Sequence, residues 1–203
     1  MGPSEGKTYK KQRLKNMKKT CYLLNLLLLI VVLTISCKEQ SKTEVVDLNY
    51  DPELRLKELN IILPSPQQPV ANYVNGVRTG NLIFLAGKGP KSAEGTELIG
   101  KLGVDVTIEE GYAGARMTAI NQLAVLKSML GDLKKVKRIV KVLGMVNSAP
   151  DFVEQPKVIN GFSDLMVVVF GDRGRHARAA VGMASLPRGQ AVEIELVVEV
   201  YED

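Results

Sequence analysis

The sequence predicts a single α+β domain over residues 51–203, with a mixed sheet and two helices on one face. Two segments carry apolar residues at helical spacing, and strand-like segments lie before, between and after them. The resulting order is strand–strand–helix–strand–helix–strand–strand, which is typical of an α+β domain. The composition agrees, because 45% apolar and 24% charged residues are ordinary for a globular protein.

The first elements are a short helix and a hairpin. Asp51-Pro52-Glu53 supplies an N-cap, a proline at the first helical position and a first-turn acid, so a helix is expected to begin there and to end before Pro64. Residues 70–77 and 82–87 are rich in strand-forming side chains, and a turn is predicted at 78–81.

The remaining elements follow from clear start and stop signals. Thr107 and Glu110 form a capping box that opens a long helix, and Gly131 closes it. A strand is predicted over 138–147, and Pro156 opens a second helix. Two further strands cover 178–186 and 191–201. With both helices on one face, the other face of the sheet needs a cover, and self-association is expected to supply it.

Residues 1–36 are interpreted as a basic leader and signal peptide. Met17-Lys18-Lys19 precedes an apolar run that is short for a membrane span, and Ser36-Cys37 ends it. This pattern resembles a bacterial lipoprotein signal, which implies lipidation of Cys37 and a linker over 37–50. The alternative is an uncleaved anchor. Both predict an exported domain tethered to a membrane, on the periplasmic or the surface side.

Charge and residue counts exclude several function classes. The leader holds seven Lys or Arg residues and one acid, so the rest of the chain carries a net charge of −1, although the whole is at +5. No nucleic-acid partner is therefore expected. From Lys38 onward there is no cysteine and one histidine, His176, so no metal site is predicted. A Ser-His-Asp triad would have to use His176.

Four stretches resemble the Rid family of reactive intermediate deaminases, also called the YjgF or L-PSP endoribonuclease family. They are residues 72–87, 140–152, 158–160 and 178–195, in the family's order over roughly 52–203. The resemblance implies a chorismate-mutase-like fold that forms a homotrimer with clefts between subunits. It implies hydrolysis of small enamino or imino acids to 2-keto acids and ammonia, without metal or organic cofactor.

The resemblance also implies roles for five residues. Arg178 matches the arginine that binds the substrate carboxylate, for which a planar guanidinium is well suited. Glu193 matches the acid that positions water or moves a proton, and Tyr73 matches the tyrosine that orients substrate or water. Asn160 and Gly87 match positions at the substrate.

Three departures leave a second function open. Ala86 stands where the deaminases usually carry serine, Ala180 where they carry cysteine or a small polar residue, and Lys88 where glutamine is common. The alternative is a non-catalytic trimeric module of the cell envelope that binds a small carboxylate or a protein. A ribonuclease, as the older family name suggests, fits the near-neutral domain poorly.

Overall fold

A computed structural model describes residues 50–202 of the chain. The predictions for the leader at 1–36, for lipidation of Cys37 and for the linker up to Asn49 lie outside these residues. Within the described part, no helix combines the length and apolar character that a membrane crossing requires.

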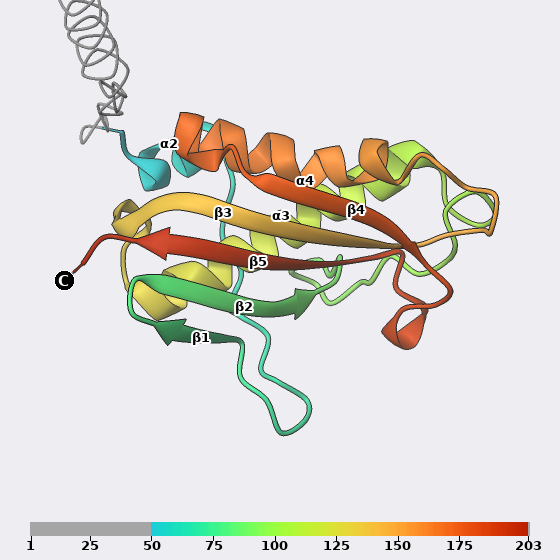
Figure 1. Cartoon of the computed structure of the whole chain (residues 1–203), viewed down its shortest axis with the longest axis horizontal. Helices are drawn as coiled ribbons and strands as arrows, with labels where there is room; N and C mark the ends of the chain where they lie inside the picture. The colour runs from blue at the N-terminus through green and yellow to red at the C-terminus, as the bar shows by residue number, and fades with distance from the viewer. Residues whose placement is uncertain (1–49, 203) are drawn as a thin grey trace, which may run out of the picture. The chain divides into compact units, whose positions relative to one another are not determined.

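One five-stranded sheet forms the centre of the domain, in the order β1-β2-β5-β3-β4 (Figure 1). Its strands are β1 (Gly76–Thr79), β2 (Leu82–Lys88), β3 (Val136–Asn147), β4 (Ala177–Met183) and β5 (Val192–Val200). Only β3 and β4 run parallel, and the other neighbours are antiparallel. The sheet is therefore mixed, as the sequence predicted.

The helices begin and end where their capping residues predict. In α2 (Pro52–Glu58) the Asp51 carboxylate accepts from two backbone N–H groups at 3.0 and 3.2 Å. In α3 (Ile108–Leu130) the capping box of Thr107 and Glu110 is present, and Gly131 adopts the left-handed conformation at φ 75°. The second long helix, α4 (Gln155–Phe170), has Pro156 in its first turn and ends at Gly171.

The hydrophobic core lies between the sheet and the two long helices. Along β5, Val192, Ile194 and Leu196 are buried, and the residues between them are not. From the helices, α3 contributes Leu123 and Leu126. Figure 1 shows α3 behind the sheet, while β2 and β5 have no helix in front of them. The expectation of helices on one face is confirmed.

The predicted hairpin forms, but its first strand is wrong in position. Residues 70–75 are not a strand, and β1 instead runs through Arg78 and Thr79, which were predicted as turn. The true turn is Gly80-Asn81, with Gly80 at φ 57°. Val70 is 82% exposed, so the apolar character of this segment does not reflect burial in the sheet.

A bulge interrupts the pairing of β2 with β5 between Leu85 and Lys88. A side chain of α3 bridges this gap: the buried Gln122 amide donates to the Ala86 carbonyl at 3.0 Å and to the Ile194 carbonyl at 2.8 Å. One residue of each strand is thus held by the helix as well as by the ladder.

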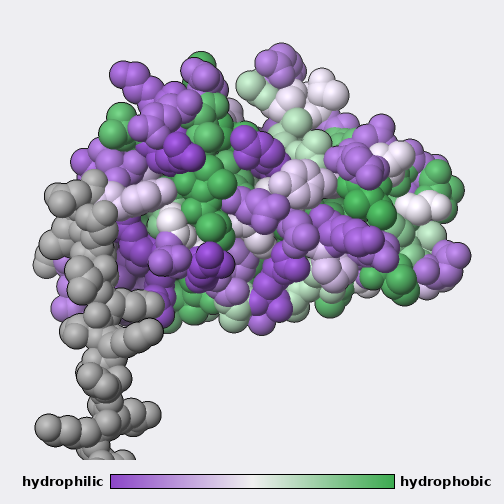
Figure 2. All heavy atoms as spheres, turned by 90° about the horizontal axis from the view of Figure 1, so that it is seen from above, coloured by the Kyte–Doolittle hydropathy of each residue, from purple (hydrophilic) through white to green (hydrophobic). Residues whose placement is uncertain are grey.

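The uncovered face of the sheet carries exposed apolar side chains. Val77 pairs with Phe84, and these side chains are 56% and 46% exposed. Val181 on β4 is 39% exposed. By contrast, the surface seen from above in Figure 2, on the α4 side of Figure 1, is mostly hydrophilic, with smaller hydrophobic areas between. The open sheet face is thus available for burial against another surface.

Gly161 allows α4 to pack closely against α3. A methyl group at this position would overlap the backbone carbonyl of Tyr112. We expect Gly161→Ala to lower the free energy of unfolding by roughly 1–3 kcal/mol, because the overlap is with backbone. This outweighs the gain of about 1 kcal/mol in helix propensity.

Urea unfolding followed by circular dichroism measures this effect. Lys157→Ala, at an exposed position of the same helix, is the control and should change stability by less than about 0.5 kcal/mol. Equal stability of Gly161→Ala and wild type would contradict the close packing.

Candidate functional site

Arg178 lies on the edge strand β4, and its side chain contacts α4. Its Nη1 donates to Asn160 Oδ1 at 2.9 Å and to Ser163 Oγ at 3.0 Å. Asn160 and Ser163 are three residues apart, so they occupy the same face of α4. The chain crosses from β3 through α4 to the parallel strand β4, which brings this helix face to Arg178.

His176 completes this group of residues. Its Nε2 lies 3.0 Å from Ser163 Oγ, and its Nδ1 lies 2.7 Å from the Gly174 carbonyl oxygen. Burial of the ring, together with the positive charge of Arg178, lowers the pKa of His176 below its usual 6.5. We call Asn160, Ser163, His176 and Arg178 the arginine cluster.

Glu193 lies on β5 and packs against β2. Its carboxylate lies in the space that a Cβ of residue 87 would occupy, so Gly87 leaves room for the Glu193 side chain in this position. Lys88 follows in β2; it is buried, and its Nζ donates to Asn75 Oδ1 at 2.6 Å. We call Gly87, Lys88 and Glu193 the glutamate cluster.

The glutamate cluster shifts the proton affinity of its carboxyl group. Burial raises the pKa of Glu193, the neighbouring Glu195 raises it further, and Arg188 and Lys88 oppose the rise. Burial also lowers the pKa of Lys88, against the attraction of Glu193. A carboxyl group with a raised pKa holds a proton closer to neutral pH, which suits general acid–base chemistry.

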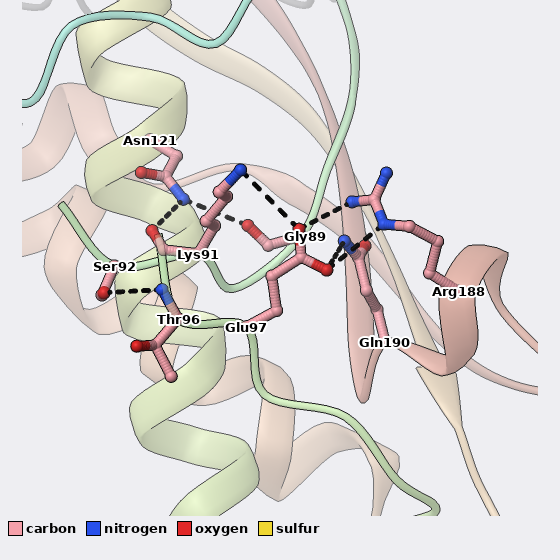
Figure 3. A network of polar contacts seen from close by, with 8 residues as sticks. All are labelled: Gly89, Lys91, Ser92, Thr96, Glu97, Asn121, Arg188 and Gln190. Carbon is pink, nitrogen blue, oxygen red and sulfur yellow. Dashed lines mark hydrogen bonds and ion pairs between the residues drawn. The ribbon is translucent and has the colours of Figure 1, made fainter. Parts of the chain in front are cut away.

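The loop after β2 is held beside the start of β5 by a polar network (Figure 3). Arg188 donates to both oxygens of Glu97, at 3.0 and 3.2 Å. Figure 3 also shows Asn121 of α3 reaching the carbonyls of Gly89 and Lys91, at 3.1 and 3.0 Å. These contacts fix the chain on either side of the glutamate cluster.

The structure brings some predicted site residues together but not all. Arg178 and Asn160 are hydrogen-bonded, and Gly87 touches Glu193. The two pairs lie on different faces of the sheet. Arg178 reaches α4, on the helix side, whereas Glu193 alternates with the buried Val192 on β5 and therefore points to the open face. Strand β3 also lies between them.

Tyr73, the fifth predicted residue, lies in the loop before β1. Its side chain is 48% exposed, and its backbone N–H donates to the Ala71 carbonyl at 2.9 Å. Nearby, the Asn75 amide donates to the Gln67 carbonyl at 2.9 Å and ties this loop to the segment after α2. Tyr73 is thus accessible, on a loop that is anchored next to β2.

Ser163 and the buried state of His176 were missed from the sequence. From the sequence, His176 was assigned no hydrogen-bond partner, whereas its ring is half-buried and hydrogen-bonded on both nitrogens. The signal was present: Ser163 is three residues after Asn160 on a helix, and His176 is two residues before Arg178 at the start of a strand. Among residues 50–202, no three His, Cys, Asp or Glu side chains gather as a metal site.

Comparison with known proteins identifies the family. A family model described as "YjgF/chorismate mutase-like, putative endoribonuclease" matches residues 53–200. The chain belongs to this YjgF, or Rid, family. Protein TCP17 of Trypanosoma cruzi is 46% identical over 145 residues, which are 71% of this chain and 91% of that protein.

Two solved structures have a similar fold. Atu1372 of Agrobacterium tumefaciens, a protein of unknown function, is 46% identical over 74% of this chain and 92% of its own, with a TM-score of 0.69. A protein of Shewanella oneidensis with the same endoribonuclease description is 31% identical over 74% of this chain and 99% of its own, with a TM-score of 0.72. The predicted Rid-like fold is confirmed.

The raised pKa of Glu193 makes the stability of this Rid protein depend on pH. A folded-state pKa above the unfolded value means that the folded chain binds the proton more tightly. The resulting stability is complete below the unfolded pKa value of 4.5 and is lost as the pH rises through the folded pKa value. We therefore expect Glu193→Gln to raise the free energy of unfolding at pH 7, by less than about 1 kcal/mol.

Urea unfolding of both proteins between pH 4 and pH 8 tests this expectation. The difference should shrink toward pH 4, and Glu202→Gln, at an exposed position just after β5, should show no such trend. A Glu193→Gln protein that is less stable than wild type at pH 7 would show that the ionised carboxylate stabilises the fold.

Proposed function

We propose that this Rid-family chain hydrolyses small reactive imino or enamino acids to 2-keto acids and ammonia. The main support for the proposal is that, in the described part of the chain, Arg178 is held in place by hydrogen bonds without being paired to a carboxylate. Its guanidinium is held by two neutral oxygens of α4, and within residues 50–202 no carboxylate pairs with it. Its positive charge therefore remains for a substrate carboxylate, and such a contact contributes roughly 1.5–3 kcal/mol.

Glu193 supplies the proton transfers of the proposed reaction. In its protonated form it donates to the carbon of an enamine or to the nitrogen of an imine. Water then adds to the carbon of the C=N bond and gives a proton to the Glu193 carboxylate. Glu193 returns this proton to the nitrogen of the resulting carbinolamine, the C–N bond breaks and its electron pair leaves with ammonia. The hydroxyl on the carbon then gives its proton to the Glu193 carboxylate, which forms the C=O bond of the 2-keto acid and restores the protonated acid. The raised pKa of Glu193 supports both directions of transfer.

The proposal places each site between two copies of the chain in a homotrimer. Arg178 and Glu193 point to opposite sides of the sheet, so within one copy the sheet separates them. Where two copies are in contact, Arg178 of one copy and Glu193 of the other can face the same cleft. The exposed Val77, Phe84 and Val181 on the open face support self-association, since a second copy would remove them from water. Tyr73 is exposed, and the proposal assigns it to the same cleft.

The alternative is a trimer that binds a small carboxylate or a protein without turnover. Ala86 and Ala180 favour it, because both are partly buried positions without a side-chain hydrogen-bonding group. Under this alternative Arg178 still binds the carboxylate. A carboxylate that stabilises the fold without product formation distinguishes binding from catalysis.

The proposal also places the domain outside the cytoplasm as a lipoprotein. The supporting observation is the basic and apolar leader ending at Ser36-Cys37. In a bacterial host, the full-length chain should incorporate labelled palmitate, and Cys37→Ser should abolish the label while the domain is still made. Equal labelling of the two proteins would contradict lipidation at this residue.

Two inactive variants test the shared site. In ammonia-release assays with imino acids generated in place by an amino-acid oxidase, Arg178→Ala should lower kcat/KM roughly 10- to 100-fold. Glu193→Gln should lower it by about 10²–10⁴-fold. Arg175→Ala is the matched control, because Arg175 is exposed and pairs with Asp172.

Trimers refolded from an equal mixture of Arg178→Ala and Glu193→Gln should regain activity. In random trimers about a quarter of the shared sites receive both native residues. Mixed trimers as inactive as the parents would overturn the shared site. A folded wild-type trimer that releases no ammonia from any imino acid would overturn the deaminase in favour of the binding module.

A further inference from the structure

A continuous chain of hydrogen bonds links the Gly174 carbonyl to the guanidinium of Arg178. It runs from Gly174 O to His176 Nδ1 at 2.7 Å, from His176 Nε2 to Ser163 Oγ at 3.0 Å, and from Ser163 Oγ to Arg178 Nη1 at 3.0 Å. Neither Ser163 nor His176 belongs to the residues that the family resemblance assigns to the site.

The chemistry of the two ends determines the direction of every bond in this chain. A carbonyl oxygen only accepts, so His176 Nδ1 carries the hydrogen. In a neutral ring Nε2 must then accept, and the donor is the Ser163 hydroxyl. The oxygen of that hydroxyl keeps lone pairs, which accept from Arg178 Nη1. Neutral His176 is therefore the form that fits this arrangement.

The contacts on Arg178 are confined to one end of its guanidinium. Nη1 donates both to Ser163 and to Asn160, and in the described part of the chain Arg178 makes no other hydrogen bond. The edge formed by Nε and Nη2 is thus left for a ligand. This edge presents two parallel N–H groups, which is the geometry that a carboxylate accepts in bidentate form.

The charged groups around the cluster do not compete for this edge. Asp172, in the loop before β4, pairs with Arg175 at 3.1 Å. Asp164, on α4, accepts from the Tyr112 hydroxyl at 2.9 Å. Among residues 50–202, the charge that acts on the His176 ring is that of Arg178 itself.

We propose that Ser163 and His176 form a positioning pair that holds Arg178 with its Nε–Nη2 edge toward the carboxylate of a 2-keto or imino acid. This inference rests on the proposed function, because it takes Arg178 as the carboxylate-binding residue. The pair does not touch the substrate. It acts through the rotamer of Arg178, which without the Ser163 contact is held only by Asn160 on the solvent-exposed side of α4.

Protonation of His176 breaks the pair. The charged ring makes Nε2 a donor, so the Ser163 hydroxyl loses its acceptor, and the ring then repels Arg178. Carboxylate binding is therefore expected to weaken as the pH falls below 6.5 through the pKa of His176, which burial lowers. Protonation of Glu193 on acidification removes a negative charge and would strengthen anion binding, so it cannot produce this weakening.

Calorimetric titration with pyruvate, a 2-keto acid of the proposed product class, tests the pair without requiring turnover. Ser163→Ala should weaken pyruvate binding at pH 7.5 about 2- to 10-fold, the effect of one neutral hydrogen bond. Ser163→Thr keeps the hydroxyl and should restore binding. Ser185→Ala, an exposed serine after β4, is the matched control and should bind as wild type.

His176→Gln separates positioning from a merely structural role. The glutamine carbonyl accepts from Ser163 but does not titrate, so this variant should bind pyruvate at pH 7.5 and lose the weakening toward pH 5. In the turnover assay, Ser163→Ala should raise KM and leave kcat within about twofold.

The outcomes distinguish this inference from the proposed function. Pyruvate binding that Ser163→Ala weakens, without ammonia release by wild type, would overturn the deaminase and support the pair. Equal pyruvate binding by wild type and Ser163→Ala, or an unchanged pH dependence in His176→Gln, would overturn the pair. A wild-type protein that does not bind pyruvate would overturn both.

Discussion

The alternation of side chains along β5 is the constraint on which both the core and the site depend. β5 pairs with β2 on one side and with β3 on the other, so its register fixes three strands at once. Val192, Ile194 and Leu196 must lie under the helices, because they are fully buried members of the core. Glu193 is then forced onto the open face, where burial and a neighbouring glutamate raise its pKa. A core requirement therefore determines where the acid lies.

Arg188 and Arg178 differ in their hydrogen-bond partners, and this difference determines whether the positive charge remains available to a ligand. Arg188 forms both of its hydrogen bonds to the Glu97 carboxylate, and this pair fastens a loop. Arg178 is held by an amide oxygen and a hydroxyl oxygen, which fix its position without cancelling its charge. The first arrangement stabilises local structure, whereas the second keeps a cation available to a ligand.

Much of this arrangement could be predicted from the sequence, and the exceptions have physical reasons. The caps at Asp51, Thr107 and Gly131 are local, so short motifs reveal them. Residues 70–75 were misassigned because apolar side chains look the same in a strand and in an exposed loop, until pairing partners are known. The hydrogen-bond partners of His176 depend on how α4 packs against β4. The number of histidines in the sequence excludes some kinds of site, but it does not predict this packing.

The family resemblance points to Arg178 and Glu193 as candidate site residues, but it does not give their separation across the sheet. The positions of both follow from strand order and face, which are properties of the assembled domain. Lys88 departs from the glutamine that is common in the family. In the structure its side chain is buried and donates a hydrogen bond to Asn75. Sequence motifs thus named the chemical groups, and the fold determined which of them are neighbours.

The contact of Gln122 with the bulge has a consequence for the order of folding. β2 and β5 are separated by more than a hundred residues in the chain, so their pairing forms late and at a high entropic cost. Beside the bulge the Gln122 amide donates to the carbonyls of Ala86 and Ile194, so α3 adds a contact to each strand where the ladder is interrupted. The alignment that places Gly87 against Glu193 therefore gains this support only when α3 docks, so we expect the glutamate cluster to form together with the core.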